Sequence, residues 1–454
     1  MLNILSVYKS VPYTNDALKL LRSGWTMPDD LEIPCLSDDN SVPIKDRLEV
    51  TKTTLVEVEG RIQNAGSEAE QILLHNIARL PIIQLRQKLT EEARVNMPRT
   101  IVTYPEAKQK TEEILYAAIE KVTGKPHVNV NQIWGYDDEV ALVVATLLDA
   151  EGQDHETHGI SRILDYTPAV LDGKINPQGK VASVKESYGK LSFDGDGTFG
   201  QVAVQMALQG GLEYMSHLDD GSLVVVMRNA YHAGRIEWIL RQAARAGYSS
   251  IAMFNVGGRV APEPDGMEPR WGTNPIGFGV STGIGEDGVV GDIATTARPE
   301  GWIRVAYLNG LSVPLDVLRT PDGTPVIEPD GAYREKGLPD LLLPLGGEIA
   351  AHKGAVLGQM IDLFTDAASD RKVGEPMLPK KNNLVLILNK DNEDVFVSMR
   401  EKVSRIQSCK TASGNPVRIP GAVGLEKLGL AQVNGLNVAE EIWGQVDKLH
   451  SKLC

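Results

Sequence analysis

Cysteine is scarce in this 454-residue chain, which contains only Cys35, Cys409 and Cys454. The three residues are an odd number, lie far apart in the sequence and form no C-x-x-C pair. Disulfide frameworks and cysteine-rich zinc sites both need more cysteines at closer spacing. The sequence therefore predicts neither a disulfide-stapled fold nor a structural zinc site.

Long apolar runs and a surplus of positive charge are also missing. No apolar run approaches the ~20 residues that span a bilayer, and the first residues, MLNILSVYKSVPYTN, lack the basic segment, apolar core and cleavage site of a signal peptide. Acidic residues outnumber basic ones by 60 to 46, and the resulting net charge of -14 repels nucleic acids and anionic membranes. We therefore expect a cytoplasmic protein that binds neither nucleic acid nor membrane.

What the chain does contain is the ordinary mixture of a globular protein, with 42% apolar and 23% charged residues. Its length exceeds that of one ordinary core, so two or three lobes are expected. Residues 1–104 form an appended segment, in which a polar stretch at 26–43 precedes two stretches of helical apolar spacing interrupted by Pro81. The segment suits an oligomerisation arm, and equally a partly ordered extension with no role in chemistry.

From about residue 105 the pattern mixes helices and strands. Apolar spacing near the helical period predicts helices at 106–122, 137–152, 233–247, 352–368 and 437–453. Short apolar runs predict buried strands at 222–229 and 249–255. These strands and the helix between them make a βαβ-like unit with His232 at its strand-to-helix turn, and Asn437 is a candidate N-cap of the last helix.

The stretch FDGDGTFGQ, residues 193–201, matches two functional motifs at once. Its glycines spell the dinucleotide fingerprint G-x-G-x-x-G, but the next acidic pair, Asp219 and Asp220, precedes the following strand and cannot reach a ribose from there. Its start, D-x-D-G-T, resembles a phosphatase nucleophile loop, yet the same acidic pair follows too closely to hold Mg²⁺ across a sheet. Asp and Gly are typical turn residues, so the stretch is interpreted as a turn before a helix.

A stronger constellation of motifs flanks that turn. In chain order it consists of HETHGISRI (155–163), RNAYHAGRI (228–236), RWGTNPIGFG (270–279), GDIATTA (291–297), LPLGGEIAAHKG (343–354) and VRIPG (417–421). From about residue 105 to the C-terminus, these segments resemble the malate/L-lactate dehydrogenase-like family of nicotinamide oxidoreductases. This non-Rossmann group includes reductases of 2-oxo acids and cyclic imino acids, and ureidoglycolate dehydrogenase.

The resemblance implies an α/β fold whose cofactor sheet is predominantly antiparallel and seven-stranded, with a helical catalytic and dimerisation region and the N-terminal helical extension. It divides the chain into the extension at 1–104, a catalytic and substrate region at 105–228, a cofactor domain at 229–371, and a C-terminal segment at 372–454 that returns to the catalytic region. It also implies NAD or NADP as cofactor, a small carboxylate as substrate, and a homodimer or higher homo-oligomer.

The proton-donor loop of the family corresponds to Thr157, His158, Gly159 and Arg162. If a helix starts at Gly159, the i, i+4 spacing places Arg162 on the same side as His158. A guanidinium can then bind a substrate carboxylate while an imidazole transfers a proton to the neighbouring group. On spacing alone, His158 could instead end a surface helix beside a solvated Arg162. His155 and His158 also have metal-pair spacing, but no third ligand accompanies them, so no metal is expected.

Cofactor contacts are implied at the second histidine loop, in which His232, Ala233, Gly234 and Arg235 would present a helix N-terminus and a positive charge to a pyrophosphate. His232 is an alternative acid or base, or a buried structural histidine. Lys353, in the H-K-G segment at the start of the helix after LPLGGEIAAH, fits phosphate for the same reasons. The resemblance further assigns cofactor contacts to Asp292, Ala294, Thr295, Arg418, Pro420 and Gly421, and a substrate contact to Thr273.

Three positions depart from the family pattern: Glu300, which stands where the family usually has arginine, Trp302 and Ala422. Trp302 stands where one branch has an aspartate of the proton relay and another branch has lysine, so a relay is either absent or supplied by Glu300, another candidate substrate contact. Ala422 replaces the glutamate of P-G-E. We expect an NAD(P)H-dependent enzyme that transfers hydride to or from C2 of a 2-oxo acid or cyclic 2-imino acid. The alternatives are an altered relative that serves in binding or assembly, and a non-redox lyase or epimerase with tightly held cofactor.

Overall fold

The computed structural model describes residues 44–67, 70, 74, 89–90, 97–127, 129–309, 311–329, 341–369, 382–412 and 414–454. Its contacts group into two compact units. The first comprises residues 1–97, 306–318 and 325–337, and the second comprises residues 98–305, 319–324 and 338–454. Every candidate site residue belongs to the second unit, while the boundary expected near residue 104 stays a prediction.

In the first unit the structure describes one long helix, α3 (Ile44–Gln63), which the sequence pattern did not predict. The two stretches of helical spacing after residue 67 lie almost entirely outside the described residues. The remaining short elements of the two units are α11 (Glu300–Leu308), β8 (Leu318–Arg319), β9 (Pro325–Val326) and β10 (Leu341–Leu342).

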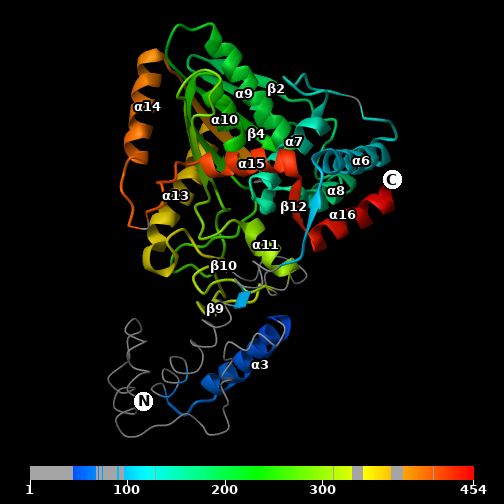
Figure 1. Cartoon of the computed structure of the whole chain (residues 1–454), viewed down its shortest axis with the longest axis vertical. Coiled ribbons are helices and arrows are strands. Elements are labelled where there is room, and N and C mark those ends of the chain that lie inside the picture. The colour runs from blue at the N-terminus through cyan, green and yellow to red at the C-terminus, as the bar shows by residue number, and fades with distance from the viewer. Residues whose placement is uncertain are drawn as a thin grey trace. The chain divides into compact units, whose positions relative to one another are not determined.

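A seven-stranded sheet is the centre of the second unit (Figure 1). Its strand order is β2-β3-β4-β11-β5-β6-β7. Only β3 and β4 pair in parallel, and the other five pairings are antiparallel. The strands are β2 (Ala182–Ser187), β3 (Lys190–Asp194), β4 (Ser222–Ala230), β5 (Tyr248–Asn255), β6 (Ile276–Val280), β7 (Val289–Ile293) and β11 (Asn382–Lys390). The expected predominantly antiparallel, non-Rossmann sheet is therefore confirmed.

Two helix layers cover the faces of this sheet. Side chains alternate along a strand, so Val225 and Val226 of β4 point to opposite faces. On the Val225 face lies α9 (Gly200–Ser216), whose Gly211 packs against Val225, together with α10 (Glu237–Arg245). On the other face, Val226 and Val385 form a buried cluster with Ile361 of α13 (Gly347–Ala368). The central strands are thus buried on both sides, which explains their continuous apolar runs.

The predicted strands at 222–229 and 249–255 are confirmed as β4 and β5, but they do not pair with each other. β11 lies between them and is antiparallel to both. The parallel βαβ unit of this sheet is instead β3-α9-β4, in which the D-G-D-G-T turn joins β3 to α9.

Helices from both ends of the second unit pack beside the sheet (Figure 1). They are α6 (Tyr104–Thr123), α7 (Glu139–Gly152), α8 (Ile163–Leu171), α14 (Glu393–Gln407), α15 (Ala422–Asn434) and α16 (Glu440–Leu453). α6 has a complete set of signals, because Thr103 caps its N-terminus and Gly124 ends it in a left-handed conformation.

The predicted N-cap at Asn437 is wrong. Asn437 lies within β12 (Leu436–Ala439), where it pairs with Ile101 of β1 (Arg99–Val102), and α16 begins only at Glu440.

Within the described ranges, no helix combines the length and the apolarity that crossing a membrane requires.

Candidate functional site

The D-G-D-G-T turn is a structural element that brings α9 against the second histidine loop. Asp196 and Gly197 adopt left-handed conformations, with φ of 50° and 70°, and the Gly197 amide donates to the Asn229 carbonyl at 2.8 Å. Asp194 accepts hydrogen bonds from the side chains of Arg228 and Asn229. The interpretation of this stretch as a turn before a helix is confirmed.

His232 follows β4 in an irregular segment. α10 begins only at Glu237, so the expectation that residues 232–235 form a helix N-terminus is wrong. Gly234 has a φ of 69°, a left-handed conformation that turns the backbone back, and its amide donates to His232 Nδ1 at 3.3 Å. The segment is a tight turn whose conformation is coupled to the imidazole.

The two candidate histidines, 74 residues apart in sequence, lie against each other. His158 ends a short 3-10 helix, η2 (Glu156–His158), and its ring stacks on that of His232 with a centroid separation of 5.5 Å and an interplanar angle of 23°. Burial and the nearby Arg162 guanidinium lower the pKa of both imidazoles well below the ordinary value. Both rings are therefore neutral at neutral pH.

A buried tyrosine orients the His232 ring. Tyr166 Oη lies 2.7 Å from His232 Nδ1, and Gln201 Nε2 donates to the same Oη at 3.0 Å. Because Tyr166 accepts from Gln201 and the Gly234 amide donates to Nδ1, the tyrosine proton points to Nδ1 and the ring hydrogen resides on Nε2. Sequence reasoning missed Tyr166, although it follows Arg162 by one helical turn.

Arg162 lies beside the histidines, though not on the expected helix. His158 and Arg162 belong to successive 3-10 helices, η2 and η3 (Ile160–Arg162), before α8 begins. Arg162 Nε donates to the Thr157 carbonyl at 2.6 Å, and Nη1 lies 3.1 Å from Asp165 Oδ2. Thr157 Oγ1 is in turn 2.9 Å from His158 Nδ1. The structure therefore brings together Thr157, His158, Arg162 and His232.

The N-terminus of α11 borders the same cluster. A Cβ at Gly301 would lie 2.5 Å from Arg162 Nη2, so this glycine admits the guanidinium. Although burial opposes it, the charges of Asp165 and Glu300 raise the pKa of Arg162. Sequence reasoning missed Arg304, which also pairs with Asp165.

Trp302, the departure from the family relay, takes part in a different interaction. The guanidinium of Arg298 lies over its ring, 5.1 Å from the centroid.

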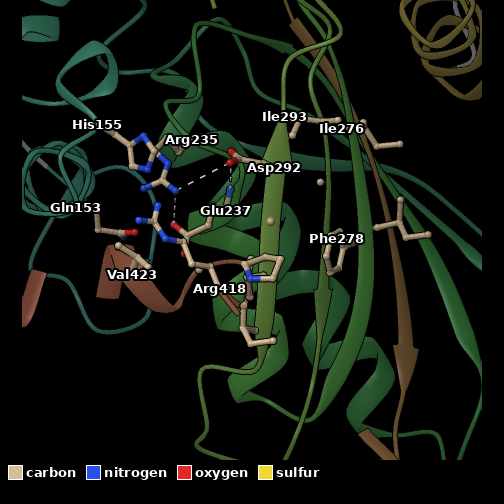
Figure 2. A pocket seen from close by; sticks show the side chains of 18 residues that line it. Gln153, His155, Arg235, Glu237, Ile276, Phe278, Asp292, Ile293, Arg418 and Val423 are labelled. Atoms are coloured by element: carbon tan, nitrogen blue, oxygen red, sulfur yellow. Dashed lines mark hydrogen bonds and ion pairs between the residues drawn. The ribbon is translucent and has the colours of Figure 1, made fainter. Parts of the chain in front are cut away.

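A cavity of about 640 Å³ lies beside β7, lined by segments that are far apart in sequence (Figure 2). Five of the residues assigned to the cofactor line it: Arg235, Asp292, Arg418, Pro420 and Gly421. His155 and Gln153 line it too, which places the cavity beside the loop that carries His158.

Arg235 is the central charge of this cavity. Its guanidinium lies between the carboxylates of Glu237, at 3.4 Å, and Asp292, at 4.0 Å (Figure 2). Its Nη1 is buried and has no hydrogen-bond partner. Burial and Arg235 lower the pKa of His155 to about 4, so His155 adds no charge at neutral pH. A buried guanidinium nitrogen without a partner suits an anionic or hydroxyl-rich ligand.

The other assigned residues do not line this cavity. Thr295 is fully buried, and its hydroxyl donates to the carbonyls of Thr273 and Asn274. Lys353 is exposed on α13, shortly after the non-helical Ala350. Their roles as substrate or cofactor contacts, like that of Ala294, stay predictions.

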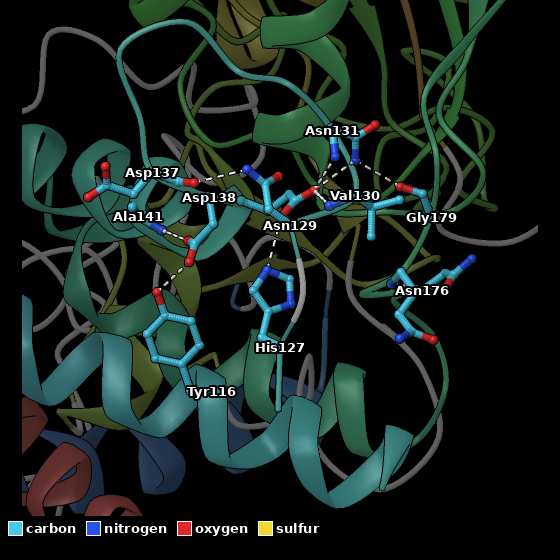
Figure 3. A network of polar contacts seen from close by, with 12 residues as sticks. Tyr116, His127, Asn129, Val130, Asn131, Asp137, Asp138, Ala141, Asn176 and Gly179 are labelled. Atoms are coloured by element: carbon cyan, nitrogen blue, oxygen red, sulfur yellow. Dashed lines mark hydrogen bonds and ion pairs between the residues drawn. The ribbon is translucent and has the colours of Figure 1, made fainter. Parts of the chain in front are cut away.

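α7 connects these features because both of its ends are fixed. At its N-terminus, Glu139 accepts from the amides of Val130 and Asn131 at 2.8 and 2.7 Å, and lies 3.0 Å from His127 Nε2. Asn131 extends the network to the Gly179 carbonyl at 3.0 Å (Figure 3).

At the C-terminus of α7, Asp149 pairs with Arg241 of α10 at 2.6 Å, and Gln153 reaches the cavity. At this end α7 is therefore tied to α10 and leads directly into the segment that lines the cavity and carries His155 and His158.

Comparison with known proteins identifies this arrangement. Residues 130–447 match the malate/L-lactate dehydrogenase family. The chain is 29% identical to an L-lactate dehydrogenase of Cupriavidus necator over 325 residues, 68% of this chain and 90% of that protein. It is 33% identical to hydroxycarboxylate dehydrogenase B of Escherichia coli over 243 residues, 53% of this chain and 64% of that protein.

The fold also matches solved structures. The malate dehydrogenase of Entamoeba histolytica superposes with a TM-score of 0.65 at 22% identity, covering 78% of this chain and 98% of that one. The Δ1-piperideine-2-carboxylate reductase of Pseudomonas syringae gives a TM-score of 0.61 at 21% identity, over 77% and 99% of the two chains. Because the family match spans more than half of the chain, the chain belongs to the malate/L-lactate dehydrogenase family and is an oxidoreductase.

Proposed function

We propose that the protein is an NAD(P)H-dependent oxidoreductase that reduces a 2-oxo acid or cyclic 2-imino acid, or oxidises the corresponding product. The observation that carries the proposal is the stacked pair His158–His232 beside the Arg162 guanidinium. This combination supplies the two functions the reaction needs from the protein: a proton carrier and a group that binds a carboxylate.

His232 is the better proton carrier of the two histidines. Its hydrogen resides on Nε2 because Tyr166 and Gly234 both donate to Nδ1. In reduction, the neutral His232 ring gives its Nε2 proton to the oxygen or nitrogen on C2 while Nδ1 takes the hydroxyl proton of Tyr166, so the ring stays neutral. In oxidation both protons move in the opposite direction, while Arg162 holds the carboxylate on C1 in place. His158 stacks on the His232 ring and packs beside the reacting imidazole.

The cavity beside β7 fits a dinucleotide. Arg235 Nη1 is buried without a partner, Arg418 lies exposed at the lining, and Asp292 can accept hydrogen bonds from ribose hydroxyls. A bound nicotinamide cofactor supplies or accepts the hydride. The protein therefore needs only to position the substrate, move one proton and exclude water.

Names of the relatives support the substrate class. They include lactate, malate, sulfolactate and ureidoglycolate dehydrogenases, and a piperideine-2-carboxylate reductase shares the fold.

A homodimer is part of the proposal. α13 presents the exposed apolar side chains Val356, Met360, Leu363 and Phe364 at helical spacing, as a subunit interface does. Light scattering of the purified protein tests this, and a monomeric mass would contradict it.

The test of the activity is the absorbance of reduced nicotinamide with a panel of 2-oxo acids and cyclic imino carboxylates, each with NADH and with NADPH. We expect turnover with at least one pair, and a loss on the order of 10²–10⁴-fold in His232→Ala with cofactor affinity retained. His158→Ala is the matched comparison, and we expect a smaller loss of turnover from it. Cofactor that binds but is never consumed with any acid would overturn the proposal in favour of non-redox chemistry.

A further inference from the structure

Glu151, in the last turn of α7, is a buried carboxyl group that the proposed reaction does not use. Its Oε2 accepts the backbone N–H of Ile160 at 2.8 Å. It lies so close to Gly159 that a Cβ at that position would be 2.0 Å from Oε2. Position 159 of the T-H-G segment therefore requires glycine, because any side chain there would displace either the Glu151 carboxyl group or the loop itself.

The peptide that Glu151 holds lies midway between the two functional side chains. His158 immediately precedes Gly159, and the Arg162 amide donates to the Gly159 carbonyl at 3.0 Å. Hydrogen bonds such as Ser161 Oγ to the Glu156 carbonyl and Arg162 Nε to the Thr157 carbonyl lie within the loop, whereas the Glu151 carboxyl group ties the loop to α7. A change in the position of this peptide moves His158 and Arg162 relative to each other.

The charges around Glu151 favour its neutral form. Burial raises its pKa to about 8, and the nearby carboxylates of Glu156 and Asp154 act in the same direction. The Ile160 N–H and the Arg99 guanidinium, which is paired with Glu156, act in the opposite direction. At neutral pH the group is thus a protonated acid whose carbonyl oxygen can accept the N–H bond without placing a charge in the interior.

We propose that Glu151 is a positioning residue, which sets the separation of His158 from Arg162 by holding the Gly159–Ile160 peptide against the end of α7. This inference rests on the proposed function. It assigns to α7 a direct influence on the reaction. Through Glu151 the helix holds the loop that carries His158, and through Gln153 at its C-terminus it borders the cavity.

Three full-length variants test the proposal. Glu151→Gln keeps a carbonyl oxygen for the Ile160 N–H, Glu151→Ala removes it, and Glu401→Ala changes an exposed glutamate of α14 as a control. The measurements are kcat and KM for substrate, Kd for cofactor, the pH profile of kcat/KM, and hydrogen exchange of a peptide covering 154–162.

We expect Glu151→Ala to exchange faster in that peptide and to lose kcat/KM on the order of 10²-fold, with cofactor Kd unchanged, because a shift of about 1 Å costs this much. Glu151→Gln should restore most of the activity. The wild-type rate should decline as the pH rises through about 8, and Glu151→Gln should abolish this decline, since the glutamate ionises in this range and glutamine does not.

A folded Glu151→Ala with wild-type kcat/KM would overturn the proposal, as would a Glu151→Gln that is as slow as alanine while its peptide remains protected. If Glu151→Ala does not fold, the activity and pH profile of Glu151→Gln decide. A wild-type protein without turnover would refute the proposed function instead, and the exchange data would still show whether Glu151 holds the loop.

Discussion

Replacing Gly200 by alanine adds a methyl group where the structure already has backbone atoms. Gly200 is the first residue of α9, and a Cβ there would lie 2.3 Å from the Tyr231 carbonyl oxygen and 2.4 and 2.5 Å from the carbonyl carbon and oxygen of His232. Separations below about 3 Å do not occur between real Cβ atoms and their neighbours. Because the obstructing atoms are main chain, neither a rotamer change nor a small side-chain shift can relieve the overlap.

The size of the expected loss in the free energy of unfolding follows from the rigidity of these main-chain atoms. Overpacking costs about 1–3 kcal/mol where side chains can adjust, so Gly200→Ala should destabilise the protein by about 3 kcal/mol or more. The control is Gly429→Ala in the interior of α15, where a new Cβ meets nothing within 4 Å. Alanine has the higher helix propensity, so this change should add up to about 1 kcal/mol.

Urea unfolding followed by tryptophan fluorescence measures both free energies of unfolding, and turnover measures the effect on the site. Any relaxation in Gly200→Ala must move the His232 segment, so its kcat/KM should fall on the order of 10²-fold. A Gly200→Ala protein with wild-type stability and activity would refute the placement of α9 against the His232 loop. Equal effects of the two substitutions would show that helix propensity alone controls them.

Three further predictions concern charge and cofactor binding. Arg162→Lys should raise the KM of the acid on the order of tenfold with kcat less affected, because a point charge cannot reproduce a planar guanidinium fork; an unchanged KM would place the substrate carboxylate elsewhere. The folded pKa of His155, about 4, lies below its ordinary 6.5, so the unfolded state binds more protons in this range and stability should be lost as the pH falls from about 6.5 to 4; urea midpoints that fall equally in wild type and His155→Gln would contradict this. Asp292→Ala should weaken the binding of cofactor, measured by fluorescence titration, more than it raises the KM of the acid, and equal losses would argue against the cavity beside β7 as the cofactor site.

The sequence predicted those parts of the fold that local patterns encode. The strands at 222–229 and 249–255 are apolar runs, and the helices at 106–122 and 137–152 have a helical period and capping residues. The pairing partners of the strands are not encoded locally, so the insertion of β11 between β4 and β5 had no signal in either strand. The start of α10 was misplaced because the left-handed Gly234 delays the helix to Glu237.

The candidate site likewise contains residues that the sequence predicted and residues that it did not. The histidines and Arg162 stand in short motifs, whereas Tyr166 and Glu151 look like parts of ordinary helices. Only the fold places the Tyr166 hydroxyl against a histidine 66 residues away, or encloses Glu151 so completely that it becomes neutral. Interactions between distant segments decide the protonation and orientation of the reacting groups, and no pattern within one segment records them.

The position of β11 has a consequence for the synthesis of the protein. β4 and β5 are separated by an α-helix and emerge early, but the strand that joins them is made of residues 382–390, more than 120 residues after β5 ends. Until then the Val-rich β4 has an open edge on the side where β11 will insert, and such edges recruit other strands. Late pairing over long sequence separations is slow, and partly folded chains with open edges aggregate. We therefore expect partly synthesised chains to depend on chaperones until residues 382–390 are available to form β11.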